Sequence, residues 1–159
     1  MATANLSAYD LNSVPDGSPF TIHLVVSQWN KEITTPLSEG AIETLKKHGV
    51  RVENIKLWEV PGSFELIYGA KKAQSFKPDA VIAVGSVIKG ETMHFDFVCQ
   101  AVSQGIKDLN VASEVPVIFC VLTDDTVQQA KDRSGGKHGN KGTEAAVAAL
   151  QMSQLRAAQ

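Results

Sequence analysis

Short apolar segments alternate along this chain with longer segments whose apolar residues recur at helical spacing. The segments 20–26 (FTIHLVV), 55–60 (IKLWEV), 81–84 (VIAV) and 115–122 (VPVIFCVL) have the length and composition of strands. The first and third are nearly all apolar, which is typical of strands that are covered on both faces in a parallel sheet. We therefore expect four strands separated by helices.

The segments between these strands carry helix signals. The first helix is expected to have Thr35 as its N-cap, Pro36 at its first position and Gly49 as its stop. Residues 63–76 are expected to form the second helix and residues 143–155 the last. The third helix has an apolar stripe made of Phe95, Val98, Val102, Ile106 and Leu109. This alternation predicts an α/β fold, a three-layer α/β/α sandwich around a four-stranded parallel sheet in flavodoxin-like order.

Composition predicts a domain boundary and argues against nucleic-acid, membrane and metal partners. Residues 1–18 are polar and rich in loop formers, so we expect a flexible N-terminal tail followed by a single domain over residues 19–159. A net charge of −2 gives no electrostatic case for nucleic acid, and no apolar run reaches transmembrane length. Cys99 and Cys120 lie 21 positions apart, which suggests neither a zinc site nor a disulfide. We expect a cytoplasmic protein with no metal, nucleic-acid or membrane partner.

The loops that follow the predicted strands carry the candidate chemistry, because ligands of parallel sheets bind at the carboxyl ends of the strands. Gly90, Glu91 and Thr92 offer backbone N–H groups and a hydroxyl to an anion, although such a segment can equally be a plain helix cap. His94 would lie on the same rim and could transfer protons near neutral pH, with a surface histidine of no function as the alternative. Trp29 is either a stacking platform or ordinary packing.

A second candidate segment, residues 132–144 (DRSGGKHGNKGTE), places four basic residues among four glycines. We expect an exposed, flexible loop that presents its cations to solvent or to a ligand. Arg133 is the best phosphate-binding candidate in it, because a planar guanidinium can bind an oxyanion through two hydrogen bonds. The alternative is a basic loop that is merely solvated.

Several blocks of the sequence, in the same order, resemble the lumazine synthase family. They are SQWN, VPGSFEL, GSVIKGETMHFDFVCQ and the long segment from VPVIFC to LQM, and the similarity covers about residues 20–155. The resemblance implies the penultimate step of riboflavin biosynthesis without cofactor or metal. In that step 5-amino-6-(D-ribitylamino)uracil condenses with 3,4-dihydroxy-2-butanone 4-phosphate to 6,7-dimethyl-8-ribityllumazine, with release of phosphate and water.

The resemblance also implies roles for individual residues. Trp29 stands where the family has an aromatic residue, usually phenylalanine, that stacks on the pyrimidine ring. The other residues matched to the pyrimidine and ribityl groups are Ser63, Phe64, Glu65, Ser86, Val87, Ile88, Phe119 and Lys141. Glu91, Thr92 and Arg133 match the phosphate site, and His94 matches the proton-transfer histidine. Glu91 departs from the family, where a small residue is usual, so its carboxylate is expected to face water.

Family members assemble, and the resemblance extends to that property. It implies a homopentamer whose active sites lie between neighbouring subunits, with Phe119, Arg133 and Lys141 coming from the second chain. The compact segment 135–142 (GGKHGNKG) is of the kind that accompanies icosahedral 60-mers, and riboflavin synthase is a further partner that the resemblance suggests.

Two other interpretations of the sequence require different residues. A catalytically idle flavin binder or a shell-forming protein would have no need of His94, Arg133 and Glu65 together, so the three residues favour an enzyme. A response regulator needs an aspartate at the end of the third strand, where we expect Gly85 and Ser86 instead.

Overall fold

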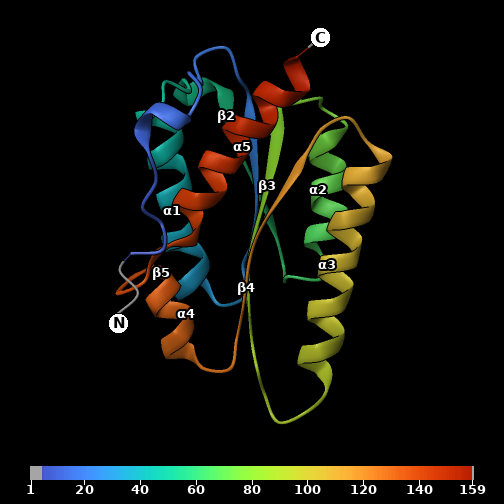
Figure 1. Ribbon diagram of the computed structural model, residues 1–159. Helices are drawn as coiled ribbons and strands as arrows, with labels where there is room; N and C mark the ends of the chain where they lie inside the picture. The colour runs from blue at the N-terminus through green and yellow to red at the C-terminus, as the bar shows by residue number, and fades with distance from the viewer. Residues whose placement is uncertain (1–4, 159) are drawn as a thin grey trace.

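The computed structural model describes residues 5–158, which form a four-stranded parallel sheet with helices on both faces (Figure 1). The strands run in the order β2-β1-β3-β4, which confirms the predicted flavodoxin-like order. The strands of this sheet are β1 (Ile22–Ser27), β2 (Ile55–Val60), β3 (Ala80–Ile88) and β4 (Val117–Asp124). The helices are α1 (Lys31–Lys47), α2 (Leu66–Gln74), α3 (His94–Ala112), α4 (Val127–Arg133) and α5 (Lys141–Ala157). Two 3-10 turns, η1 (Leu11–Ser13) and η2 (Val52–Asn54), precede β1 and β2.

The core has two halves, one on each face of the sheet. Alternate β1 residues Ile22, Leu24 and Val26 pack with apolar residues of α1 and α5. Val25 points to the opposite face, which α2 and α3 cover with residues such as Leu66 and Val102. Successive side chains of a strand point to opposite faces, so a nearly all-apolar strand requires exactly this double cover, and the three-layer prediction is confirmed.

The start of α1 differs from the prediction. The helix begins at Lys31 after Asn30, whose left-handed φ of 58° ends the preceding loop, and Pro36 therefore lies inside the helix. The predicted N-cap at Thr35 is wrong. The first turn is held from outside the helix, because Ile33 is fully buried and the Thr34 hydroxyl donates to the Ser27 carbonyl at 2.8 Å.

The third strand is longer than the apolar run that predicted it. β3 continues to Ile88 because Gly85 to Ile88 pair in parallel register with Val121 to Asp124 of β4. The expected end of this strand at Gly85 and Ser86 is therefore wrong, but Ile88 and the following Lys89 also supply no aspartate there. The extra residues carry β3 into the edge of the sheet where the loops gather.

The glycine-rich segment is more ordered than the sequence indicated. Its residues include the last turn of α4, the two short antiparallel strands β5 (Ser134–Gly136) and β6 (Gly139–Asn140), and the first turn of α5. The prediction of an exposed, flexible loop is wrong for Ser134, which is only 7% exposed. Arg133 is also largely covered, and its guanidinium is paired with Glu144.

Part of the predicted N-terminal tail also contacts the domain. The Tyr9 hydroxyl lies 2.9 Å from His48 Nε2 at the end of α1, and the Gly17 N–H donates to the His48 carbonyl at 2.7 Å. Residues 1–4 lie outside the described residues. The flexibility of the tail as a whole stays a prediction.

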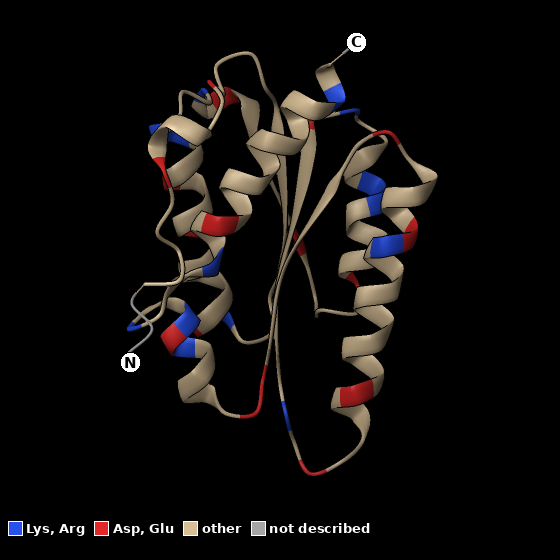
Figure 2. Ribbon diagram, viewed as in Figure 1, with Lys and Arg blue, Asp and Glu red and all other residues tan. Residues whose placement is uncertain are grey.

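Charge is spread over the outside of the fold. Figure 2 shows basic and acidic residues interspersed along the helices, in keeping with the net charge of −2. Within residues 5–158, no helix combines the length and the apolar character that a membrane crossing requires.

Candidate functional site

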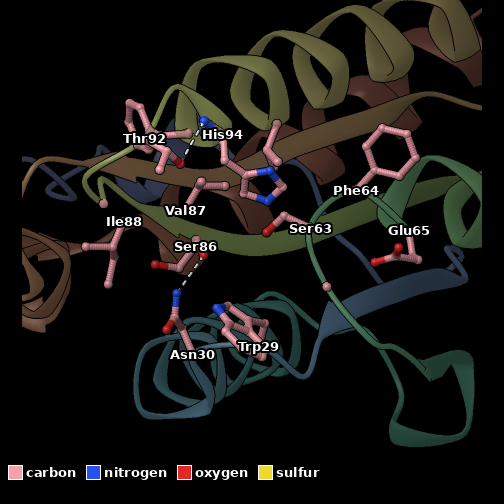
Figure 3. A pocket seen from close by; sticks show the side chains of 14 residues that line it. Trp29, Asn30, Ser63, Phe64, Glu65, Ser86, Val87, Ile88, Thr92 and His94 are labelled. Atoms are coloured by element: carbon pink, nitrogen blue, oxygen red, sulfur yellow. Dashed lines mark hydrogen bonds between the residues drawn. The ribbon is translucent and has the colours of Figure 1, made fainter.

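A cavity of about 620 Å³ opens at the carboxyl ends of β1, β2 and β3 (Figure 3). Each strand delivers residues to it through the loop that follows, and the N-terminal turns of α3 close one side. Its lining consists of Trp29, Asn30, Gly62, Ser63, Phe64, Glu65, Ser86, Val87, Ile88, Gly90, Thr92, His94, Phe95 and Val98. The topology thus brings together three sequence segments that are about thirty residues apart, as the loop rule for parallel sheets requires.

Asn30 fixes the loop after β1 against β3. Its side-chain amide donates to the Ser86 carbonyl at 3.0 Å, which the left-handed backbone of Asn30 allows (Figure 3). Asn30 was not among the residues predicted for the site. The available signal was its type, since asparagine tolerates the left-handed region better than most residues and is a preferred residue before a helix.

Two buried hydroxyls border the cavity without a hydrogen-bond partner among the described residues. They are Ser63 Oγ and Ser86 Oγ. Gly85 makes room for the first, because a Cβ at that position would lie 2.8 Å from Ser63 Oγ. Leaving a buried polar group unpaired costs about 1–3 kcal/mol, so these hydroxyls favour a ligand that bears polar groups.

His94 and Trp29 border the cavity from opposite sides in Figure 3. His94 is the first residue of α3, and its N–H lies 3.4 Å from Thr92 Oγ1. The imidazole projects into the cavity rather than packing into the core (Figure 3). Trp29 is 71% exposed, so its indole face is available for stacking. A flat apolar surface and a group that can transfer protons therefore share one site.

Arg133 is held away from this cavity in a cluster of paired charges. Its Nη2 donates to Glu144 Oε1 at 2.5 Å and its Nη1 to the His138 carbonyl at 2.7 Å. Lys141 Nζ donates to the other oxygen of the same carboxylate at 2.9 Å. Burial alone would raise the pKa of Glu144, but hydrogen bonds from Arg133, Lys141 and Ser7 outweigh burial and hold that pKa below its ordinary value. Glu144 thus orients two cations at once.

The remaining predicted residues lie elsewhere on the surface. Phe119 of β4 is 37% exposed and lines a separate hollow of about 480 Å³ against α3. Glu91 is exposed in the loop between β3 and α3 and does not line the cavity at Trp29. Among the described residues, no three His, Cys, Asp or Glu side chains gather as a metal site would require.

Comparison with known proteins relates this geometry to a family. The sequence model of the 6,7-dimethyl-8-ribityllumazine synthase family matches residues 19–157. The chain belongs to that family. It is 62% identical to the 6,7-dimethyl-8-ribityllumazine synthase of Christiangramia forsetii, over 96% of this chain and 92% of the relative. The corresponding proteins of Flavobacterium psychrophilum (61% identical, 98% and 84% covered) and Parabacteroides distasonis (57%, 96% and 97%) are similar over comparable lengths.

The residues that the resemblance to lumazine synthases singled out form two groups in this chain. The cavity contains Trp29, Ser63, Phe64, Glu65, Ser86, Val87, Ile88, Thr92 and His94. Outside it lie Glu91 in the loop before α3, Phe119 on β4, Arg133 at the end of α4 and Lys141 at the start of α5. One chain alone therefore does not gather all of them around the Trp29 cavity.

Proposed function

We propose that this chain catalyses the condensation of 5-amino-6-(D-ribitylamino)uracil with 3,4-dihydroxy-2-butanone 4-phosphate to 6,7-dimethyl-8-ribityllumazine. The observation that carries the proposal is the family match over residues 19–157, together with relatives of this name that are about 60% identical over nearly the whole chain. The cavity is compatible with it, because an exposed indole, two free hydroxyls and a histidine border one space. No cofactor takes part in the proposed reaction.

The pyrimidine would stack on Trp29, and its ribityl chain would meet the segment of Ser63, Phe64 and Glu65. The amine forms a C–N bond to the ketone carbon, and the resulting carbinolamine loses water to an imine. Loss of the C3 proton lets phosphate leave with the electron pair of its C–O bond, which gives an enol that tautomerises to a new ketone at C3. The second nitrogen attacks this carbonyl, and the ring closes with loss of water. His94 is assigned the proton transfers, since it projects into the cavity where these bonds change.

The phosphate would bind Thr92, the backbone N–H of Glu91, and Arg133 from a neighbouring subunit. The separation of Arg133, Lys141 and Phe119 from the Trp29 cavity within one chain supports a site that two subunits share. We extend the proposal to a homopentamer, its further assembly into an icosahedral 60-mer, and an association with riboflavin synthase. Cys99 and Cys120 are free thiols, in keeping with a cytoplasmic location.

The direct test is to mix the purified protein with both substrates and to follow the green fluorescence of the lumazine. Product should form faster than in the protein-free mixture, and omission of either substrate should abolish it. An idle binder would bind the lumazine without accelerating its formation. A rate equal to that of the protein-free mixture would therefore reject the enzyme and favour the binder.

Assembly has its own measurement. Analytical ultracentrifugation of active protein should show a pentamer or a multiple of it, because the monomer lacks part of the proposed site. Activity that sediments as a monomer would overturn the shared site while leaving the reaction itself intact.

A further inference from the structure

The N-terminal segment 5–9 lies against the β5–β6 hairpin, on the elements that hold Arg133. The Leu6 N–H donates to the His138 carbonyl at 3.1 Å. Ser7 is only 6% exposed, and its N–H donates to Asn5 Oδ1 at 2.9 Å. A buried serine in a segment this polar has to satisfy its hydroxyl within the protein.

The Ser7 hydroxyl is shared between two acceptors. Ser7 Oγ lies 2.8 Å from the Asn140 carbonyl and 2.9 Å from Glu144 Oε1. A hydroxyl has one proton to donate, so the hydrogen bond is divided between these acceptors or alternates between them. Either arrangement connects the N-terminal segment to the carboxylate of Glu144.

Two acceptors of the N-terminal segment, Glu144 Oε1 and the His138 carbonyl, also orient Arg133. Its Nη2 donates to Glu144 Oε1, which also accepts from Ser7, and its Nη1 donates to the His138 carbonyl, which also accepts from Leu6. Each hydrogen bond that fixes the guanidinium thus ends on an atom that the N-terminal segment also holds. Hydrogen-bonded networks of this kind transmit the loss of one member to the others.

The hairpin is shaped to receive the segment. Gly139 has a φ of 88°, and a Cβ at this position would meet Asn5 Oδ1 and come within 2.6 Å of Ser7 Oγ. A side chain there would push residues 5–7 away from the hairpin. The pairing of the Tyr9 hydroxyl with His48 anchors the next part of the segment on α1.

We propose that Ser7 is a positioning residue for Arg133, which it orients through Glu144, and that it thereby sets the affinity for the phosphate group of the butanone substrate. The inference rests on the proposed function, because that function assigns the phosphate to Arg133. It adds a role for the N-terminal segment in the binding of one substrate. The lowered pKa of Glu144 agrees with it, since Ser7 is among the donors that favour the ionised carboxylate.

The test compares Ser7→Ala with Ser13→Ala in the full-length protein. Ser13 is the matched control, because it lies a few residues beyond this segment, is exposed, and its hydroxyl donates to the Asp10 carbonyl rather than to the elements that hold Arg133. Steady-state rates are measured with each substrate varied in turn. In Ser7→Ala, KM for the butanone phosphate should rise about 3- to 10-fold. This is less than the full effect of one hydrogen bond to a charged group, because the lost hydrogen bond acts on Arg133 only through Glu144. The kcat of Ser7→Ala and its KM for the pyrimidine should stay within about twofold of the wild type.

A double-mutant cycle distinguishes positioning of Arg133 through Glu144 from a nonspecific destabilisation of the N-terminal segment and the hairpin. If Ser7 acts through Glu144, Ser7→Ala should change the KM for the butanone phosphate by less than about twofold in a Glu144→Ala background. Equal increases of both KM values, an unchanged KM for the butanone phosphate, or an undiminished effect without Glu144 would each overturn the inference.

Calorimetric titration with inorganic phosphate keeps the test independent of turnover. Ser7→Ala should weaken phosphate binding by the same factor as it raises KM, and Ser13→Ala should not. If the wild type forms no lumazine, the proposed function fails, and the phosphate titration still decides whether Ser7 acts on an anion site at Arg133. Equal phosphate affinity of wild type and Ser7→Ala rejects the positioning role.

Discussion

Replacement of Trp29 by leucine should weaken binding of the pyrimidine and leave the fold intact. Trp29 is 71% exposed and belongs to neither half of the core, so its removal costs little packing. Surface substitutions of this kind change the free energy of unfolding by about 0.5 kcal/mol or less. The melting temperature should therefore stay close to that of the wild type.

The effect on binding is estimated from the exposed indole face. Stacking of a base on an aromatic side chain contributes about 1–3 kcal/mol, as measured by substitution. Since about 1.4 kcal/mol corresponds to a factor of ten, Kd of the ribitylaminouracil should rise roughly 5- to 150-fold. Trp29→Phe keeps a ring in place and should recover most of the affinity.

The assay is a titration that follows tryptophan emission. The chain has two tryptophans, and Trp58 lies in a separate cluster with His23 and Phe76, so Trp29→Leu reports the emission of Trp58 alone. In the wild type the emission in excess of this background should be quenched as the pyrimidine binds. A wild-type spectrum that does not change at saturation, or a Trp29→Leu variant with unchanged Kd, would refute stacking on Trp29.

Three further substitutions test the other assignments. His94→Ala should lower kcat about 100- to 10,000-fold, as loss of a general acid or base does, and should leave the melting temperature unchanged. Turnover at the wild-type rate would refute the proton-transfer role of His94. Arg133→Lys should raise KM for the butanone phosphate about tenfold or more, because an ammonium group cannot make the two parallel hydrogen bonds of a guanidinium. An equal rise of KM for the pyrimidine would contradict the assignment of Arg133 to the phosphate. The pKa of Glu144 is held below its ordinary value of 4.5, so its carboxylate stabilises the fold above about pH 4.5, and this stability is lost as the pH falls through the lower folded value. Glu144→Gln should therefore melt below the wild type at neutral pH and approach it in acid, whereas a melting difference that is constant with pH would count against the pairing.

The hydrophobic pattern along the chain accounts for the layers of the fold. Strands that are apolar at nearly every position need cover on both faces, and the stripe of α3 at helical spacing provides part of it through Val102 and Ile106. The sheet order and the loops at its carboxyl edge follow from that pattern. The loops themselves indicated Trp29, Thr92 and His94. The family resemblance added cavity residues such as Ser63 and Glu65, because it compares whole segments rather than single side chains.

The starts and ends of elements, and the side chains that meet, depend on contacts between segments that are distant in the sequence. α1 starts at Lys31 because Ile33 and Thr34 find partners outside the helix, which outweighs the local signal of Thr35 and Pro36. β3 runs on to Ile88 because β4 lies beside it to pair with those residues. Contacts between distant segments outweigh local preference wherever burial and hydrogen bonds contribute more free energy than the local preference does.

The cluster of Arg133, Lys141 and Glu144 shows most clearly what a local sequence pattern cannot predict. A basic segment among glycines predicts exposed cations, yet Arg133 is paired with Glu144, eleven residues further on in α5. Ser7 reaches the same carboxylate from 137 residues away. No local pattern encodes such a pairing, because it depends on the position that the sheet gives to α5, where hydrogen bonds from Arg133, Lys141 and Ser7 offset the burial of the Glu144 carboxylate.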